Sequence, residues 1–151
     1  MRLAPMLVPL LVFGCAKSET PKPDSSAMTA APAPTAALTE ADVAGTWTGT
    51  AKAAGTDSVF AHWTQICSAG TCRGTSQEDI KDTIPSTYTI MGDSAVGQSQ
   101  PLTPPGMKAQ VVDHWTVHIA GGKVTGTGYY TLASKADSVV SRYTFEGAKQ
   151  P

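Results

Sequence analysis

The segment 111–119 shows the clearest alternation of apolar and polar side chains in the chain. Successive side chains of an extended strand point to opposite faces of a sheet. One face of this segment carries the apolar residues Val111, Trp115, Val117 and Ile119. The other face is mostly polar and carries Val112, His114, Thr116 and His118. The pattern predicts an antiparallel strand with one packed face and one mostly solvated face.

Similar short runs of Thr, Val, Tyr and Trp continue from residue 45 to the end of the chain, separated by Gly, Pro and Asp-Ser turn signals. No stretch keeps apolar residues at helical spacing over three turns. We therefore predict an all-β fold, a single antiparallel up-and-down meander of about eight strands that forms a β-barrel or a barrel-like sandwich. The predicted strands are 45–53, 57–67, 71–77, 85–91, 95–100, 109–120, 123–133 and 137–147.

Two further local predictions concern this meander. The pair Gly121-Gly122 predicts a tight hairpin between the predicted strands 109–120 and 123–133. The alternation also predicts which side chains point inward, namely Val111, Trp115, Val117, Ile119, Val139, Tyr143 and Phe145.

Residues 38–44 predict one helical turn, and the first strand then opens with Gly45-Thr46-Trp47. A Gly-x-Trp after a short helical turn resembles the start of the calycin barrels, which include lipocalins, avidins and fatty-acid-binding proteins. The resemblance covers only these few residues. It implies that Trp47 closes the base of a barrel beneath a basic side chain, and Arg142 is the candidate for this cation–π contact. It also implies a small apolar or amphipathic ligand, with four candidate lining residues, Trp63, Trp115, Tyr129 and Tyr143.

The N-terminus has the order of an export signal. Arg2 precedes an apolar run from Leu3 to Phe13 that is too short for a membrane span, which needs about 20 residues. The residues Val12-Phe13-Gly14-Cys15 resemble the lipobox of bacterial lipoproteins. The resemblance implies that residues 1–14 are a signal peptide and that Cys15 receives diacylglycerol and an N-terminal fatty acid such as palmitate. Ala16 after this cysteine favours the outer membrane of the cell envelope, facing the periplasm.

Residues 15–37 are rich in Ala, Pro, Ser and Thr, which predicts a disordered tether behind the lipid. Residues 38–151 are then one domain, long enough for one hydrophobic core. The whole chain has 11 Lys and Arg against 12 Asp and Glu and no basic cluster, which argues against nucleic acid as a partner. We expect the membrane, through the lipid anchor, as one partner.

Cys67 and Cys72 flank a four-residue loop between two strand-like runs. An exported chain meets an oxidising compartment, and residues that face each other beside a hairpin loop lie within the reach of a disulfide. We therefore predict a disulfide between them.

Metal and other cofactors are not predicted. His114 and His118 share a face but stand four residues apart, about 13 Å at ~3.3 Å per residue, so one ion cannot take both. His62 adds at most one ligand to either. The acidic group Glu78, Asp79 and Asp82 lacks the spacing of a calcium-binding EF-hand loop and predicts a solvated turn.

Three functions remain open on the sequence. An interaction or envelope-structural domain is favoured, because no catalytic constellation is present and we expect no enzyme. The second is the binding of a small apolar molecule or amphipathic ligand, which an empty interior of about 300 Å³ or more would support and a filled interior would oppose. The third and least favoured is a hydrolase. Gly92-Asp93-Ser94 resembles the nucleophile block of GDSL hydrolases, and Ser94 or Asp113 would act with His114.

Overall fold

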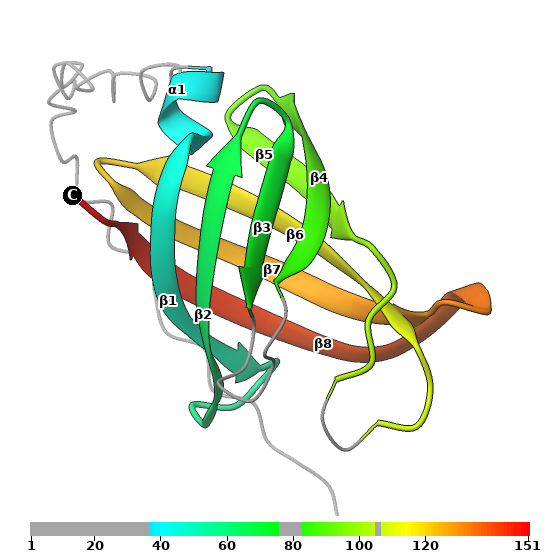
Figure 1. Ribbon diagram of the computed structural model, residues 1–151. Helices are drawn as coiled ribbons and strands as arrows, with labels where there is room; N and C mark the ends of the chain where they lie inside the picture. The colour runs from blue at the N-terminus through cyan, green and yellow to red at the C-terminus, as the bar shows by residue number, and fades with distance from the viewer. Residues whose placement is uncertain (1–36, 76–82, 105–106) are drawn as a thin grey trace, which may run out of the picture. The chain divides into compact units, whose positions relative to one another are not determined.

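The computed structural model describes residues 37–75, 83–104 and 107–151. In these residues one helical turn precedes eight antiparallel strands, which close into a barrel in sequence order (Figure 1). The elements are α1 (Glu40–Val43), β1 (Gly45–Ala53), β2 (Val59–Ser68), β3 (Thr71–Thr75), β4 (Ile84–Met91), β5 (Ser94–Ser99), β6 (Val111–Ala120), β7 (Lys123–Leu132) and β8 (Lys135–Lys149). Pairing of β8 with β1 closes the sheet, which confirms the all-β meander and decides for a barrel over a sandwich.

The predicted strand boundaries agree closely with the observed ones. The first predicted strand, 45–53, coincides with β1, and the helical turn before it is α1. The predicted hairpin at Gly121-Gly122 joins β6 to β7. The predicted strand 71–77 corresponds to β3, which ends at Thr75, and its last two residues lie outside the described part of the chain.

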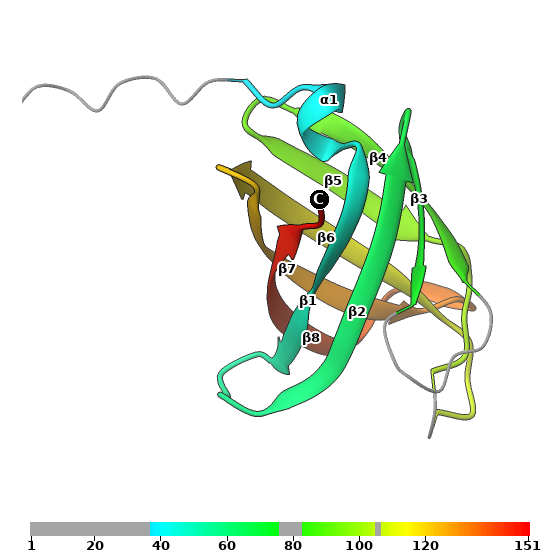
Figure 2. The same cartoon turned by 60° about the vertical axis from the view of Figure 1, so that its left-hand side comes forward.

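Connections alternate between the two ends of the barrel because consecutive strands run antiparallel. One end, here called the helix end, holds α1 and the turns at 69–70, 92–93 and 121–122. The Leu38 N–H donates to the Gly92 carbonyl at this end, over 2.8 Å. The opposite end, the loop end, is where β1 passes to β2, β5 to β6 and β7 to β8, as Figures 1 and 2 show. The turns of the helix end have two residues each, whereas the β1–β2 and β5–β6 connections of the loop end are longer.

Trp47 closes the helix end from inside. Its Nε1 donates a 2.8 Å hydrogen bond to the Val43 carbonyl of α1, and its ring is 3% exposed. The Lys149 ammonium lies 5.4 Å from the centroid of the ring. Arg142, the residue expected there, lies instead over Tyr129. The expectation was wrong because the β1–β8 register places Lys149 opposite Trp47, whereas Arg142 lies seven residues away toward the loop end.

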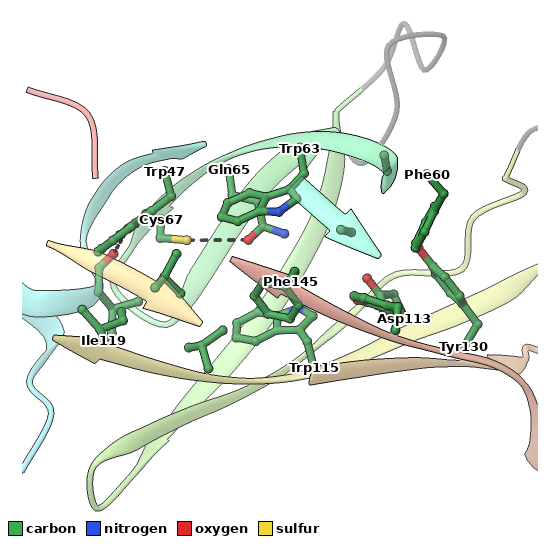
Figure 3. Close-up of a pocket in the computed structure, with 16 residues that line it drawn as sticks. Trp47, Phe60, Trp63, Gln65, Cys67, Asp113, Trp115, Ile119, Tyr130 and Phe145 are labelled. Carbon is green, nitrogen blue, oxygen red and sulfur yellow. Dashed lines mark hydrogen bonds between the residues drawn. The ribbon is translucent and has the colours of Figure 1, made fainter. Parts of the chain in front are cut away.

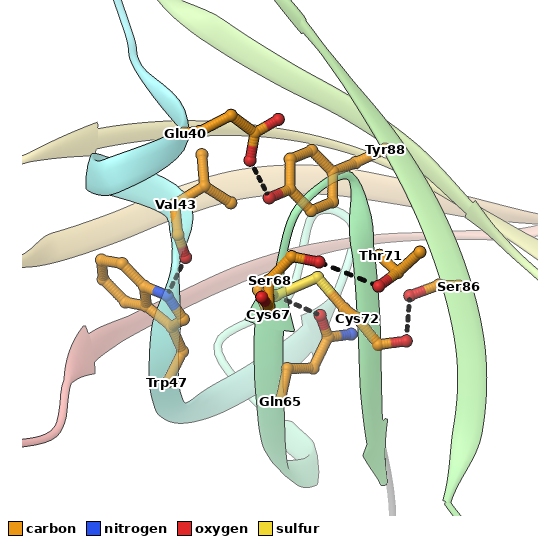
Figure 4. The surroundings of a disulfide bond; sticks show 10 residues. All are labelled: Glu40, Val43, Trp47, Gln65, Cys67, Ser68, Thr71, Cys72, Ser86 and Tyr88. Carbon is orange, nitrogen blue, oxygen red and sulfur yellow. Dashed lines mark hydrogen bonds between the residues drawn. A yellow bond between two sulfur atoms is a disulfide. The ribbon is translucent and has the colours of Figure 1, made fainter.

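The disulfide pins the β2–β3 hairpin at the helix end (Figure 4). Cys67 and Cys72 are direct partners across the two strands, and both are buried. The two-residue turn between the strands has positive φ at Ala69 (48°) and Gly70 (77°), the combination of a type I′ hairpin. The predicted disulfide is confirmed. A 2.5 Å hydrogen bond from Tyr88 to Glu40 ties α1 to the neighbouring strand β4.

Large aromatic side chains fill the barrel interior by lying over glycines of nearby strands. In each case a Cβ on the glycine would come within 2.8 Å of the ring. The aromatic and glycine partners are Trp63 with Gly49 and Gly147, Trp115 with Gly97, Tyr143 with Gly128, and Phe145 with Gly126. The glycines therefore supply the room that the rings occupy.

Six of the seven residues predicted to point inward are buried or packed against the core. Val111, Trp115, Val117 and Tyr143 are buried, and Ile119 and Phe145 are partly buried against the core. Val139 is the exception, with 42% of its surface exposed, so that prediction was wrong. β1 pairs with β8 only as far as Tyr143, and the rest of the β7–β8 hairpin projects past it (Figure 1). In the described residues no strand faces Val139 across the barrel.

A methyl group at Gly97 tests this packing. A Cβ there would lie 2.2 Å from the Trp115 ring, so we expect Gly97→Ala to lower the free energy of unfolding by about 1–3 kcal/mol. The control is Gln98→Ala, an exposed neighbour, with an expected change within about 0.5 kcal/mol. Urea denaturation measures both. Equal effects would show that the glycine is not required by the ring.

Candidate functional site

The barrel interior contains a cavity of about 70 Å³ (Figure 3). Its walls are mainly aromatic and come from both ends of the barrel, namely Trp47, Phe60, Trp63, Trp115, Tyr130, Tyr143 and Phe145. Three of the four predicted lining residues, Trp63, Trp115 and Tyr143, therefore lie where expected. Gln65 and Asp113 are the polar side chains of the lining.

The volume limits what the interior can hold. A cavity needs about 10–15 Å³ of such volume for one water molecule. Pockets for drug-sized ligands measure about 300–1,000 Å³. At about 70 Å³, this interior is mostly filled by its own side chains, and only a molecule of a few to several non-hydrogen atoms fits as it stands.

Tyr129, the fourth predicted lining residue, lies on the outer face of the barrel. Its ring stacks on His114 at 4.8 Å between centroids, and the Arg142 guanidinium lies 5.4 Å from its centroid. The adjacent Tyr130 points inward instead. The prediction for Tyr129 was wrong because neighbouring residues of a strand face opposite sides of the sheet. Of this pair in β7, Tyr130 is the residue that faces the interior.

Asp113 places a carboxyl group among the interior aromatic rings. The Tyr143 hydroxyl donates a 2.6 Å hydrogen bond to Asp113 Oδ1, and the Asp113 N–H donates to Ser99 Oγ over 2.9 Å. Burial raises the pKa of Asp113 to about 7, while the hydrogen bond from Tyr143 acts in the opposite direction. Burial and the nearby Asp113 also raise the pKa of Tyr143 well above its ordinary value.

From the sequence, Asp113 is considered only as a hydrolase candidate that would act with His114. The sequence did contain a signal for its position in the interior. Asp113 lies two residues from both Val111 and Trp115, so all three face the same side of the strand. A carboxyl group on the apolar face of a strand is a candidate for an interior site. The β6–β7 register sets it opposite Tyr130.

Besides Asp113, the indole N–H of Trp63 is a polar group in the interior. Its Nε1 is buried and has no hydrogen-bond partner among the described residues. The ring is held by an edge-to-face contact with Phe145, at 5.8 Å between centroids. A buried donor without an acceptor costs free energy, so a molecule that offered an acceptor there would gain from it.

Two side chains cover the interior at the loop end. Phe60 is 44% exposed and makes an edge-to-face contact with Tyr143 at 6.1 Å between centroids. Leu102 is 8% exposed and belongs to the same core cluster as Tyr143. The backbones of Leu102 and Val111 exchange hydrogen bonds of 2.8 and 2.9 Å, which fix this loop over the end of the barrel. The interior therefore approaches the surface at Phe60.

The residues of the hydrolase alternative are not brought together. Ser94 Oγ lies 2.7 Å from Asp93 Oδ1 and 3.1 Å from His118 Nδ1. His114 stands four residues from His118 along β6, about 13 Å in an extended strand, and contacts Thr131. Ser94 thus has no contact with His114 or Asp113, and the pair that the alternative requires is not formed.

Several sequence predictions concern residues outside the described part. These are the signal peptide 1–14, Cys15, nearly all of the tether 15–37, and the acidic residues Glu78, Asp79 and Asp82. Within the described ranges, no three His, Cys, Asp or Glu side chains are grouped to hold a metal ion. No helix of the same residues has the length and apolar character to cross a membrane. Comparison with protein-family models, curated proteins and solved structures finds no match to the chain.

Asp113 predicts a pH dependence of stability. Its pKa is higher in the folded state than in the unfolded chain, where it is near 3.8, so the stability that its proton provides is lost as pH rises from about 4 to 7. The loss is on the order of 4 kcal/mol, since one pKa unit corresponds to about 1.4 kcal/mol. We expect Asp113→Asn to remove this loss and to be more stable than the native protein at pH 8.

Urea denaturation at pH 4.5, 6 and 8 measures the effect. The control is Asp137→Asn, which changes an exposed carboxylate of the β7–β8 hairpin and should leave the pH profile unchanged. Parallel profiles for the native protein and Asp113→Asn would show that Asp113 does not hold a proton in the folded state.

Proposed function

We propose that the protein is a lipid-anchored interaction domain of the bacterial cell envelope, without catalytic activity. The lipobox-like residues Val12-Phe13-Gly14-Cys15 support the anchor, and residues 15–37 would form the tether. Ala16 supports a place on the outer membrane, facing the periplasm. The partner would be another protein of the envelope.

The observation that carries this proposal is the unequal distribution of exposed apolar side chains over a barrel whose interior is largely filled. Five of the eight large apolar residues that are exposed in the described part lie at or beside the loop end, namely Val59, Phe60, Met107, Val139 and Val140. Exposed apolar residues that gather at one end of a domain favour that end as an interaction site. A largely filled interior in turn leaves the outer surface as the larger area available for recognition.

The attachment of the tether supports the same surface. The described part of the domain begins at the helix end, where Leu38 bonds to Gly92, and the loop end lies opposite. A fully extended segment of the length of 15–37 reaches roughly 75 Å at ~3.3 Å per residue. The tether is therefore long enough to let the loop end meet a partner away from the lipid surface.

Small-ligand binding is a second candidate function. The volume of about 70 Å³ opposes a drug-sized apolar ligand. Two polar groups in the interior favour a smaller and more polar one: the Asp113 carboxyl, which accepts one side-chain hydrogen bond, and the unpartnered Nε1 of Trp63.

Replacement of Cys15 tests the anchor. We expect the native protein in the membrane fraction of the cells that produce it, with a mass raised by acyl chains. Cys15→Ala should move it to the soluble periplasmic fraction, because two or more acyl chains are needed for stable attachment. Fractionation and intact-mass analysis measure this. A Cys15→Ala protein that stayed on the membrane with an unchanged mass would refute lipidation at this residue.

Photo-cross-linking in intact cells tests the loop end. A photoreactive residue at Val140 should give a discrete adduct with one envelope protein, and the same residue at Ile66, which is exposed near the helix end, should not. Val139→Asp should abolish the Val140 adduct, whereas Met91→Asp, at the helix end, should leave it. Adducts of equal yield at both positions, or insensitivity to Val139→Asp, would contradict the proposal.

A further inference from the structure

We propose that the barrel interior binds a small organic cation, an alkylamine of a few carbon atoms, with the Asp113 carboxylate as its counter-ion and the surrounding aromatic rings as its walls. This goes beyond the loop-end interaction and does not depend on it. It gives the second candidate function a defined chemical class of ligand.

The charge of the cavity lining is the first observation. Asp113 is the one charged residue among the described residues that line the cavity, and no basic side chain accompanies it. Its carboxylate accepts one side-chain hydrogen bond, from Tyr143, whereas a carboxylate has room for about four. An ionised carboxylate in such surroundings is costly unless a cation or several donors compensate it. An ammonium group supplies both the charge and the donors.

The position of the aromatic rings is the second observation. Tyr130 faces Asp113 across the β6–β7 pair, and its ring lies 5.5 Å from that of Tyr143 between centroids. Trp115 lines the cavity two residues further along β6. Cations are attracted to the faces of such rings, most strongly where water is excluded. The same rings also provide apolar contact for the carbon atoms of the amine.

The size and the entrance of the cavity narrow the ligand further. About 70 Å³ is less than half of the ~150 Å³ of a cavity that holds benzene, so the interior has room for a short alkyl chain and not for a ring. Phe60 lines the cavity, is exposed at the loop end and contacts Tyr143, so the cavity lies beside the surface at this residue. The Nε1 of Trp63 offers a donor for a hydroxyl or ether oxygen elsewhere on the ligand.

Titration of the full-length protein in non-ionic detergent tests the proposal, with n-propylamine as the probe and 1-propanol as its neutral counterpart. Calorimetry and tryptophan fluorescence at pH 8 measure binding, with empty micelles as the blank. We expect saturable binding of n-propylamine, at least tenfold tighter than that of 1-propanol. Asp113→Asn should reduce n-propylamine affinity at least tenfold. Equal affinity for the two probes, no binding of either, or an unchanged affinity in Asp113→Asn would each overturn the proposal.

Two adjacent tyrosines provide a matched pair of variants. Tyr130→Leu removes an interior ring beside Asp113 and should weaken n-propylamine binding several-fold, whereas Tyr129→Leu changes the outer face and should not. Near-UV circular dichroism confirms that each variant is folded. Equal effects of the two substitutions would place the amine outside the interior. The cross-linking test probes the outer surface, and the amine titration probes the interior. A negative result in one test therefore does not change the meaning of the other.

Discussion

The packing of aromatic rings over glycines is the constraint on which the rest of this structure depends. A closed barrel of eight strands has an interior that side chains must fill. Here a few large rings do this, and each ring needs a neighbouring strand position without a Cβ, as Trp115 needs Gly97 and Tyr143 needs Gly128. Rings and glycines on facing strands therefore fix the register of the sheet as well as the small volume of its cavity.

The same packing sets the electrostatics of the interior. The surrounding rings partly bury and desolvate Asp113, and one hydrogen bond from Tyr143 does not offset that cost, so its pKa rises to about 7. A side chain of this kind contributes little to core packing. Its presence, together with the unpartnered Nε1 of Trp63, distinguishes this interior from a purely apolar core and makes it a candidate for recognition.

The two ends of the barrel are built differently, and this links the fold to the proposed function. At the helix end, α1, the ring of Trp47 and the disulfide close the barrel with short turns. At the loop end the β1–β2 and β5–β6 connections are longer, and apolar residues such as Phe60 and Val140 stay exposed. A helix end closed by packed side chains and a loop end with exposed apolar surface are what the proposed interaction domain would require.

Local features of the sequence by themselves determined the strands, the Gly121-Gly122 hairpin, the helical turn and the Cys67–Cys72 pairing, because period-two alternation, turn residues and short cysteine spacing act over a few residues. Most of the interior face followed from the same alternation. Only the tertiary structure decided that Lys149 rather than Arg142 covers Trp47, that Val139 is exposed, and that the barrel closes around Asp113. These depend on strand register and strand length, which are set by contacts between residues far apart in the chain.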